Sequence, residues 1–401
     1  MSSAPVGAGP RDGAPRRTTV TVLAVDDPYD PLANSGTPYA LIAAFRELGV
    51  TTLPTFRCLP RWARYLLAAT ELGSWAARGE LRPTRRALRD AYHAVWAAAV
   101  FHRVKSNLAA LRLRQHGDQL DAILQYGAVY GKAPAQCPLV TYEDMTVMQA
   151  ARHDRWTIGK LSVREIQLLI EHQRRTYAAA TACCTTTNWA ARSVIDDYGV
   201  AESKVHVVGV GRNRTPALNL NRPWHEPRYL FVGEDWERKN GPRLLSAFER
   251  VRARRPNARL DIVGRVSGLS AAGVSFHGVL GLGDADAQRR LGALFAQATC
   301  FVLPSLLEPS GISYAEAMSA GIPVIGTTAG GSNEIIGDGG IVVDPHSEDA
   351  LVAAMLSMAV PATASVVAAR GAARAEGYTW EKVALRLLDA ARGERGQPAR
   401  H

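Results

Sequence analysis

The sequence has few cysteines and no long apolar segment. Its five cysteines, among 401 residues, are odd in number and lack the spacing of metal ligands. This excludes a disulfide scaffold and predicts a reducing, cytoplasmic location. No run of 18 apolar residues occurs, and the first residues contain no apolar signal core. Neither a membrane-spanning helix nor a secretory signal is therefore expected.

Three other patterns are incomplete or absent. Basic residues are not interleaved with aromatics as in nucleic-acid-binding proteins, so no nucleic-acid partner is predicted. The pair Gly209 and Gly211 lacks the third glycine of a dinucleotide fingerprint, which argues against NAD. Asp284 and Asp286 form a D-x-D just before a predicted helix over 287–298, where acids favour the helix dipole. We interpret them as caps and predict no metal.

The composition otherwise describes an ordinary globular chain. Hydrophobic residues make up 47% and charged residues 21%, and 401 residues are enough for two domains. The net charge of +10 suits an anionic substrate such as a nucleoside diphosphate. The pattern predicts a disordered leader at 1–17, domains at 18–216 and 217–375, and a terminal helical segment at 376–401.

The stretch from Phe301 to Pro345 organises the second domain. A short apolar strand at 301–303 leads into a Pro/Ser loop that carries Glu308. The following segment, 313–320, predicts a helix with Ser313 as N-cap and Glu316 at the third position, the spacing of a capping box. A second apolar strand at 323–326 completes a strand–helix–strand unit of a parallel sheet.

The two acids of this stretch lie on either side of a predicted helix start. Free N–H groups of Ile312, Ser313 and Tyr314 would offer a phosphate site between Glu308 and Glu316. A nucleotide sugar has the matching order of ribose, diphosphate and hexose. The alternative is that Glu316 only caps its helix and Glu308 is a solvated loop acid.

The segments EPSGISYAE, AMSAGIPVI and GGSNEII closely resemble the E-x7-E donor site of family 4 retaining glycosyltransferases of the GT-B fold. The resemblance implies an α/β fold of two Rossmann-like domains facing across a cleft, with a C-terminal helix crossing back to the first domain. It further implies that Glu308 contacts the donor sugar and Glu316 the ribose. Backbone amides of Gly311, Ile312 and Ser313 would bind the diphosphate.

The resemblance also assigns positions elsewhere in the second domain. Relatives carry an Arg after the first glycine and a Lys a few residues later, both on the diphosphate. Here Glu234 occupies the Arg position and Lys239 matches the Lys, while Arg238 is a candidate replacement for the missing guanidinium. The base is expected near the backbone of Val279 and near Arg265.

In the first domain the resemblance points to two strand ends. Gly36, after the first strand, would allow the backbone to approach the donor phosphates, although an ordinary turn explains it equally. A later strand end, where relatives place a His or Asp facing the transferred sugar, reads Tyr142, Glu143, Asp144. We choose Asp144 there.

Residues 60–118 predict basic amphipathic helices. We interpret them as a helical cover over the first sheet that also shapes the acceptor pocket. The alternative, peripheral membrane contact, is not favoured.

Taken together, the sequence predicts a retaining, metal-independent hexosyltransferase without a cofactor, using a UDP- or GDP-sugar as donor. The expected acceptor is a small molecule or natural product. The alternatives are a lipid-linked or polysaccharide acceptor, a GT-B-like sugar-nucleotide epimerase, and a non-catalytic sugar-nucleotide binder. The sequence does not decide the nucleotide, the sugar or the oligomeric state.

Overall fold

The computed structural model describes residues 17–55, 99–128, 130–131, 137–153, 161–266, 268–281 and 283–394. Residues 1–16 of the predicted leader (1–17) and residues 60–98 of the predicted helices (60–118) therefore lie outside the described residues. The last part of the predicted helical cover is confirmed, because residues 99–116 form a helix.

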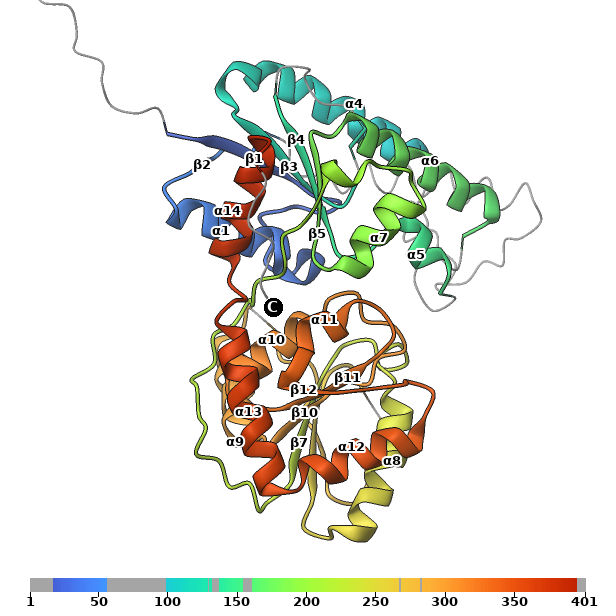
Figure 1. The fold of residues 1–401 in the computed structure, drawn as a ribbon, viewed down its shortest axis with the longest axis vertical. Helices are drawn as coiled ribbons and strands as arrows, with labels where there is room; N and C mark the ends of the chain where they lie inside the picture. The colour runs from blue at the N-terminus through green and yellow to red at the C-terminus, as the bar shows by residue number, and fades with distance from the viewer. Residues whose placement is uncertain are drawn as a thin grey trace, which may run out of the picture.

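The described residues form two α/β halves, one above the other in Figure 1. The first contains a parallel six-stranded sheet in the order β2-β1-β3-β4-β5-β6. Its strands are apolar on both faces because helices cover both sides, as expected for a parallel sheet. The elements are β1 Thr19–Leu23, α1 Thr37–Glu47, β2 Thr51–Thr52, α4 Ala99–His116, β3 Ala122–Tyr126, β4 Leu139–Glu143, α5 Val147–Ala151, α6 Val163–Ala179, β5 Ala182–Thr185, α7 Asn188–Asp196 and β6 Val205–Val207.

The second half repeats this architecture with the strand order β12-β11-β10-β7-β8-β9, again all parallel. Helix α8 packs on α12, and α10 packs on α13. The elements are β7 Arg228–Val232, α8 Gly241–Arg254, β8 Arg259–Val263, β9 Val274–Phe276, α9 Ala285–Gln297, β10 Cys300–Val302, α10 Ile312–Ser319, β11 Val324–Thr327, α11 Ser332–Ile336, β12 Gly340–Val343, α12 Glu348–Met358 and α13 Pro361–Ala375.

Helix α14, Trp380–Ala391, leaves the second half and returns to the first. It packs on α1 and against strands β3, β4 and β5, and it lies beside α1 in Figure 1. The predicted crossing of the C-terminal helix is thus confirmed. Its apolar face, which includes Val383, Leu387 and Leu388, is buried there because the helix is amphipathic.

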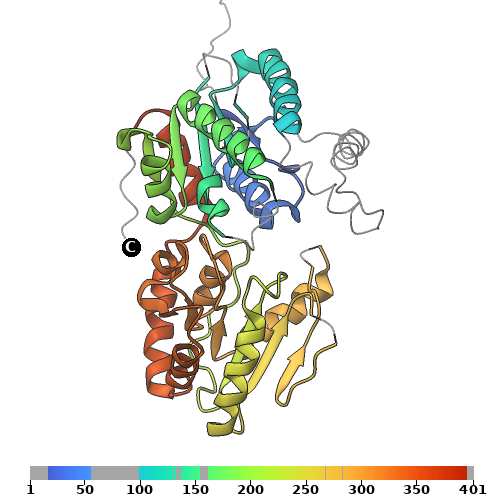
Figure 2. The ribbon, with the colours of Figure 1, turned by 90° about the vertical axis from the view of Figure 1, so that its right-hand side faces the viewer.

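The two faces of the first sheet have different cores. One face shares a continuous cluster of buried side chains with α14 and the second half, including Val22, Tyr142 and Leu387. The other face forms a separate cluster with α4 and α6, including Ile123 and Tyr177. Figure 2 shows the two halves from the side, with the carboxyl ends of the strands directed at the region between them. This arrangement places functional loops of both halves opposite one another.

Among the described residues, no single helix is long and apolar enough to cross a membrane. Helices α12 and α13 pass that test only as a pair, and the pair is bent by 93°.

Candidate functional site

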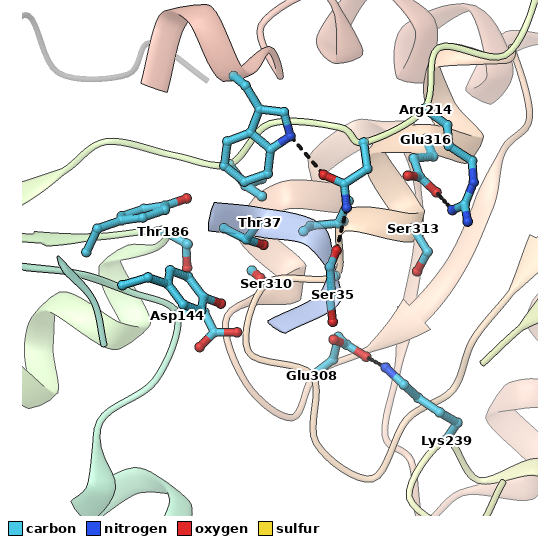
Figure 3. A pocket seen from close by; sticks show the side chains of 17 residues that line it. Ser35, Thr37, Asp144, Thr186, Arg214, Lys239, Glu308, Ser310, Ser313 and Glu316 are labelled. Carbon is cyan, nitrogen blue, oxygen red and sulfur yellow. Dashed lines mark hydrogen bonds and ion pairs between the residues drawn. The ribbon is translucent and has the colours of Figure 1, made fainter. Parts of the chain in front are cut away.

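A cavity lies between the two halves and is lined by residues of both (Figure 3), and we call it the interdomain cavity. Its described walls enclose about 200 Å³. That is less than the roughly 300–1,000 Å³ typical of ligand pockets. The lining residues are Ser35, Thr37, Tyr126, Tyr142, Asp144, Thr186, Val210, Asn213, Arg214, Lys239, Glu308, Ser310, Gly311, Ile312, Ser313, Glu316 and Trp380.

Glu308 and Lys239 form an ion pair on the second-domain wall of this cavity. Both side chains are largely buried, and Ser305 Oγ donates a further hydrogen bond to Glu308 Oε2 at 3.0 Å. Burial lowers the pKa of Lys239, and the adjacent Glu308 carboxylate opposes that shift. The pair therefore places a cation and an anion side by side in the cavity wall, where little solvent reaches them.

Gly330 fixes the loop that carries Glu308. The Glu308 N–H donates to the Ala329 carbonyl at 3.0 Å, and Glu308 and Gly330 form a parallel bridge. A Cβ on Gly330, whose φ is 105°, would lie 2.2 Å from the Glu308 carbonyl oxygen. Only glycine permits this approach, which explains the first glycine of GGSNEII locally.

The start of helix α10 differs from the prediction. The N-cap is Gly311, with φ 76°, and the helix begins at Ile312, so the predicted Ser313 cap and its capping box with Glu316 are wrong. The Tyr314 N–H, predicted to be free, donates to the Gly311 carbonyl at 3.0 Å. Gly311, Ile312 and Ser313 still line the cavity, so the N-terminus of α10 faces it as predicted.

Glu316 uses its carboxylate for an ion pair instead of a cap. It is 2% exposed, and Arg214 Nη1 donates to its Oε2 at 3.1 Å. Arg214 is held in turn by Gln288 Oε1, which accepts from its Nε at 3.0 Å. Burial raises the pKa of Glu316, whereas Arg214 and the backbone N–H groups of Asn213 and Arg214 oppose the rise. Glu316 Oε1 has no hydrogen-bond partner of good geometry among the described residues.

The first-domain wall presents Asp144, Thr186 and two tyrosines. Asp144 directly follows β4, and Thr186 directly follows β5. The rings of Tyr126 and Tyr142 meet edge to face at 5.9 Å, and Tyr142 donates to the Gly209 carbonyl at 3.0 Å. Burial raises the pKa of Asp144 to about 6, and the Glu308 carboxylate across the cavity adds to this rise. The cations Arg238 and Lys239 oppose it.

Glu143, next to Asp144, faces away from the cavity lining into the first-domain core. Tyr177 donates to its Oε1, and Gln173 Nε2 donates to Oε2 at 2.9 Å. Burial raises the pKa of Glu143 to about 8, and these two hydrogen bonds oppose the rise. Adjacent residues of one strand end thus have separate environments, because side chains alternate between faces.

The loop after β1 reaches the cavity through Ser35 and Thr37. Gly36, between them, has φ 77° and does not itself line the cavity. Asn213 joins this loop to the C-terminal helix, since its Nδ2 donates to the Ser35 carbonyl at 2.6 Å and its Oδ1 accepts from Trp380 Nε1 at 2.9 Å.

Two further predicted residues lie outside the lining. Arg238 is paired with Asp235 at 3.4 Å and donates to the Leu307 carbonyl at 3.4 Å. Val279 is 47% exposed. Glu234, at the position where relatives carry Arg, lies 4.0 Å from Arg265 on the surface. The structure therefore brings together Asp144, Lys239, Glu308, Gly311, Ile312, Ser313 and Glu316, whereas Gly36, Arg238 and Val279 are not part of the lining.

Sequence reasoning missed most of the lining residues that come from the first domain and from the segment after β6. Arg214 lies in an irregular segment without any pattern that signals a partner for Glu316. Thr186 had a usable signal, because it ends a buried strand and the carboxyl ends of parallel strands form binding sites.

Among the described residues, no group of three or more His, Cys, Asp or Glu side chains could hold a metal ion. The D-x-D acid Asp284 caps α9, accepting from the N–H of Asp286 at 2.9 Å and of Ala287 at 3.2 Å, as predicted.

The sequence was compared with protein families and with known proteins. Residues 226–359 match the family model described as "Glycosyl transferases group 1". The chain is 37% identical over 98 residues to the O-antigen chain mannosyltransferase B of Escherichia coli, covering 24% of this chain and 26% of the relative. It is 29% identical over 225 residues to a D-inositol 3-phosphate glycosyltransferase of Nocardiopsis dassonvillei, covering 50% of this chain and 52% of the relative. The aligned regions thus span about a quarter and a half of these relatives.

Among solved structures, sucrose-phosphate synthase from Thermosynechococcus elongatus superposes with a TM-score of 0.63 at 17% identity. The superposition covers 94% of this chain and 98% of the synthase. The chain therefore has the two-domain GT-B fold, and within it residues 226–359 match the glycosyl transferases group 1 model.

Proposed function

We propose that the chain is a glycosyltransferase that moves a hexosyl unit from a nucleoside diphosphate sugar to an acceptor nucleophile. The observation that carries this proposal is the second-domain wall of the interdomain cavity. Two buried carboxylates, Glu308 and Glu316, flank the N-terminus of α10, and each is paired with a cation. The match of residues 226–359 to the group 1 model and the glycosyltransferases among the relatives support transfer of a sugar as the chemistry.

The binding mode follows from the chemistry of these groups. The unpaired Glu316 Oε1 is buried, and a ribose hydroxyl donating to it would satisfy it. The N–H groups at Ile312 and Ser313, with Lys239, favour the diphosphate between the two acids. Glu308 would then accept from hydroxyls of the transferred sugar. Gly36, Arg238 and the Val279 backbone remain proposed peripheral contacts to the phosphates and base.

The proposed reaction is front-side substitution with retention at the anomeric carbon. The bond from that carbon to the diphosphate oxygen breaks as the acceptor oxygen bonds to the same face, and a leaving phosphate oxygen takes the acceptor proton. Lys239 and the α10 N-terminus stabilise the negative charge that develops on the leaving group. Asp144, on the opposite wall, positions the transferred sugar. No protein nucleophile, resident cofactor or metal takes part in this scheme.

The donor is proposed to be a UDP- or GDP-sugar and the acceptor a small molecule. The D-inositol 3-phosphate glycosyltransferase among the relatives supports a small polyol-type acceptor. Because another relative is an O-antigen chain mannosyltransferase, a polysaccharide or lipid-linked acceptor is the second choice.

The first test is a thermal-shift titration with UDP, GDP, ADP and dTDP, each with and without magnesium. We expect one nucleotide to raise the melting temperature without magnesium. The matching nucleotide sugar is then incubated with an acceptor panel, and the anomeric configuration of the product is read by NMR. Stabilisation by none of the nucleotides would contradict the proposal. Release of an altered free sugar without an acceptor would instead indicate an epimerase.

A further inference from the structure

We propose that Thr186 is a specificity residue that hydrogen-bonds a ligand hydroxyl from the first-domain wall of the interdomain cavity. This inference rests on the proposed function and adds a recognition contact opposite the two acids. It identifies the moiety held there as polyhydroxylated, either the transferred sugar or the acceptor.

The position of Thr186 sets it apart from its neighbours. Its N–H donates to the Glu143 carbonyl at 3.0 Å, which continues the pairing of β5 with β4 to the cavity edge. Thr185 Oγ1 donates to the Thr187 carbonyl at 3.0 Å, and Thr187 Oγ1 caps α7 by accepting from the Ala190 N–H at 3.3 Å. The hydroxyls of the residues on both sides of Thr186 therefore form hydrogen bonds within the protein.

The Thr186 hydroxyl forms no such hydrogen bond among the described residues. The residue is only 3% exposed, it lines the cavity, and its Oγ1 has no hydrogen-bond partner among the described residues. A buried hydroxyl without a partner carries a desolvation penalty that a ligand hydroxyl can remove. Two buried threonines of the described residues, Thr141 and Thr186, have an Oγ1 without a hydrogen-bond partner. Only Thr186 lines the cavity, so its hydroxyl is the one that a ligand can reach.

The surroundings favour a hydroxyl over a charged group. Thr186 shares its wall with Tyr126, Tyr142 and Asp144. The cations Lys239 and Arg214 are instead paired with Glu308 and Glu316, as Figure 3 shows. A threonine hydroxyl both donates and accepts, which matches a sugar or polyol hydroxyl. Asp144 can accept from a neighbouring hydroxyl of the same ring.

The test compares Thr186→Val, which keeps the shape and removes the hydroxyl, with Thr186→Ser, which keeps the hydroxyl. Thr141→Val is the matched control, because Thr141 is equally buried on β4 but does not line the cavity. Melting curves verify that all variants fold. Calorimetry then measures the affinities for UDP, GDP, UDP-glucose and GDP-mannose, and kinetics measure the acceptor KM wherever wild type transfers sugar.

If the hydroxyl belongs to the sugar, Thr186→Val weakens nucleotide-sugar binding about 3- to 10-fold and leaves binding of the bare nucleotide unchanged. If it belongs to the acceptor, the acceptor KM rises by the same factor instead. In either case Thr186→Ser restores most of the loss. The corresponding deoxy sugar or deoxy acceptor should bind the Val variant and wild type equally.

The inference is overturned if Thr186→Val behaves like Thr141→Val in both measurements. A wild-type chain that transfers no sugar contradicts the proposed function separately. In that case the nucleotide-sugar affinities still test Thr186, and equal affinities in Thr186→Val and Thr141→Val overturn the inference.

Discussion

The two walls of the interdomain cavity hold their polar groups in different ways. On the second-domain wall, Glu308 and Glu316 are each paired with a cation. On the first-domain wall, Thr186 Oγ1 has no partner among the described residues, and Asp144 has a pKa raised to about 6 by burial. Both carboxylates of the second-domain wall are thus held in ion pairs before a ligand binds. Under the proposed function, the Thr186 hydroxyl of the first-domain wall, like Glu316 Oε1, would gain its hydrogen-bond partner from the ligand.

The largest expected effect comes from breaking the pair on the second-domain wall. Glu308→Ala should reduce transfer at least about 100-fold while the chain still folds, because it removes the proposed charged contact to the sugar beside the leaving group. The turnover rate measures the loss of transfer, and circular dichroism measures whether the variant folds. Asp286→Asn, an exposed carboxylate outside the cavity, is the control. Full turnover in the Ala variant would show that the paired acid is not needed.

A smaller effect is expected at the other acid of this wall. Glu316→Ala should raise the donor KM about 10-fold and change kcat little, because the proposed hydrogen bond of Glu316 is to the ribose and not to the reacting atoms. Steady-state kinetics with varied donor measure both constants. A fall in kcat with an unchanged donor KM would place Glu316 at the reacting centre and remove the distinction between the two acids.

Asp144 tests the first-domain wall through pH. Its raised pKa means that it becomes ionised as pH rises through about 6, and the ionised form accepts hydroxyl hydrogen bonds. Wild-type kcat should therefore rise between pH 5 and 7. Asp144→Asn should lower kcat about 3- to 10-fold and flatten the profile over this interval. A pH profile that keeps its shape in the Asn variant would assign the titration to another group.

The smallest effect on activity is expected at Glu143, whose side chain lies outside the cavity lining. Glu143→Gln should change kcat less than about 2-fold and act on stability instead. The pKa of Glu143 is raised to about 8 in the folded chain, so its contribution to stability is complete below the ordinary Glu pKa and is lost as pH rises towards 8.

The stability measurement compares urea unfolding of wild type and Glu143→Gln at pH 5 and pH 8. Wild type should lose at least about 1 kcal/mol more than the variant between these values. An equal pH dependence of both proteins would show that Glu143 is already ionised at pH 5, and a large loss of kcat would connect it to the site.

The strand and helix pattern of the chain was predictable, because short apolar runs and helical periodicity are local. Both the strand at Phe301 and the amphipathic helix near Trp380 form as expected, with boundaries shifted by one or two residues. The start of α10 was predicted wrongly. Ser313 and Glu316 have capping-box spacing, but Gly311 adopts a positive φ and begins the helix earlier, and Arg214 engages the carboxylate.

The sequence by itself determined which residues could do chemistry on the second-domain wall, since the E-x7-E spacing and the α10 N-terminus lie within one short stretch. Only the tertiary structure decided their partners. Lys239 and Glu308 are 69 positions apart, and Arg214 and Glu316 are 102 apart. Asp144 and Thr186 reach the opposite wall because the strands before them are parallel neighbours in the first sheet. Such pairings depend on how the two halves dock, and no local pattern encodes that.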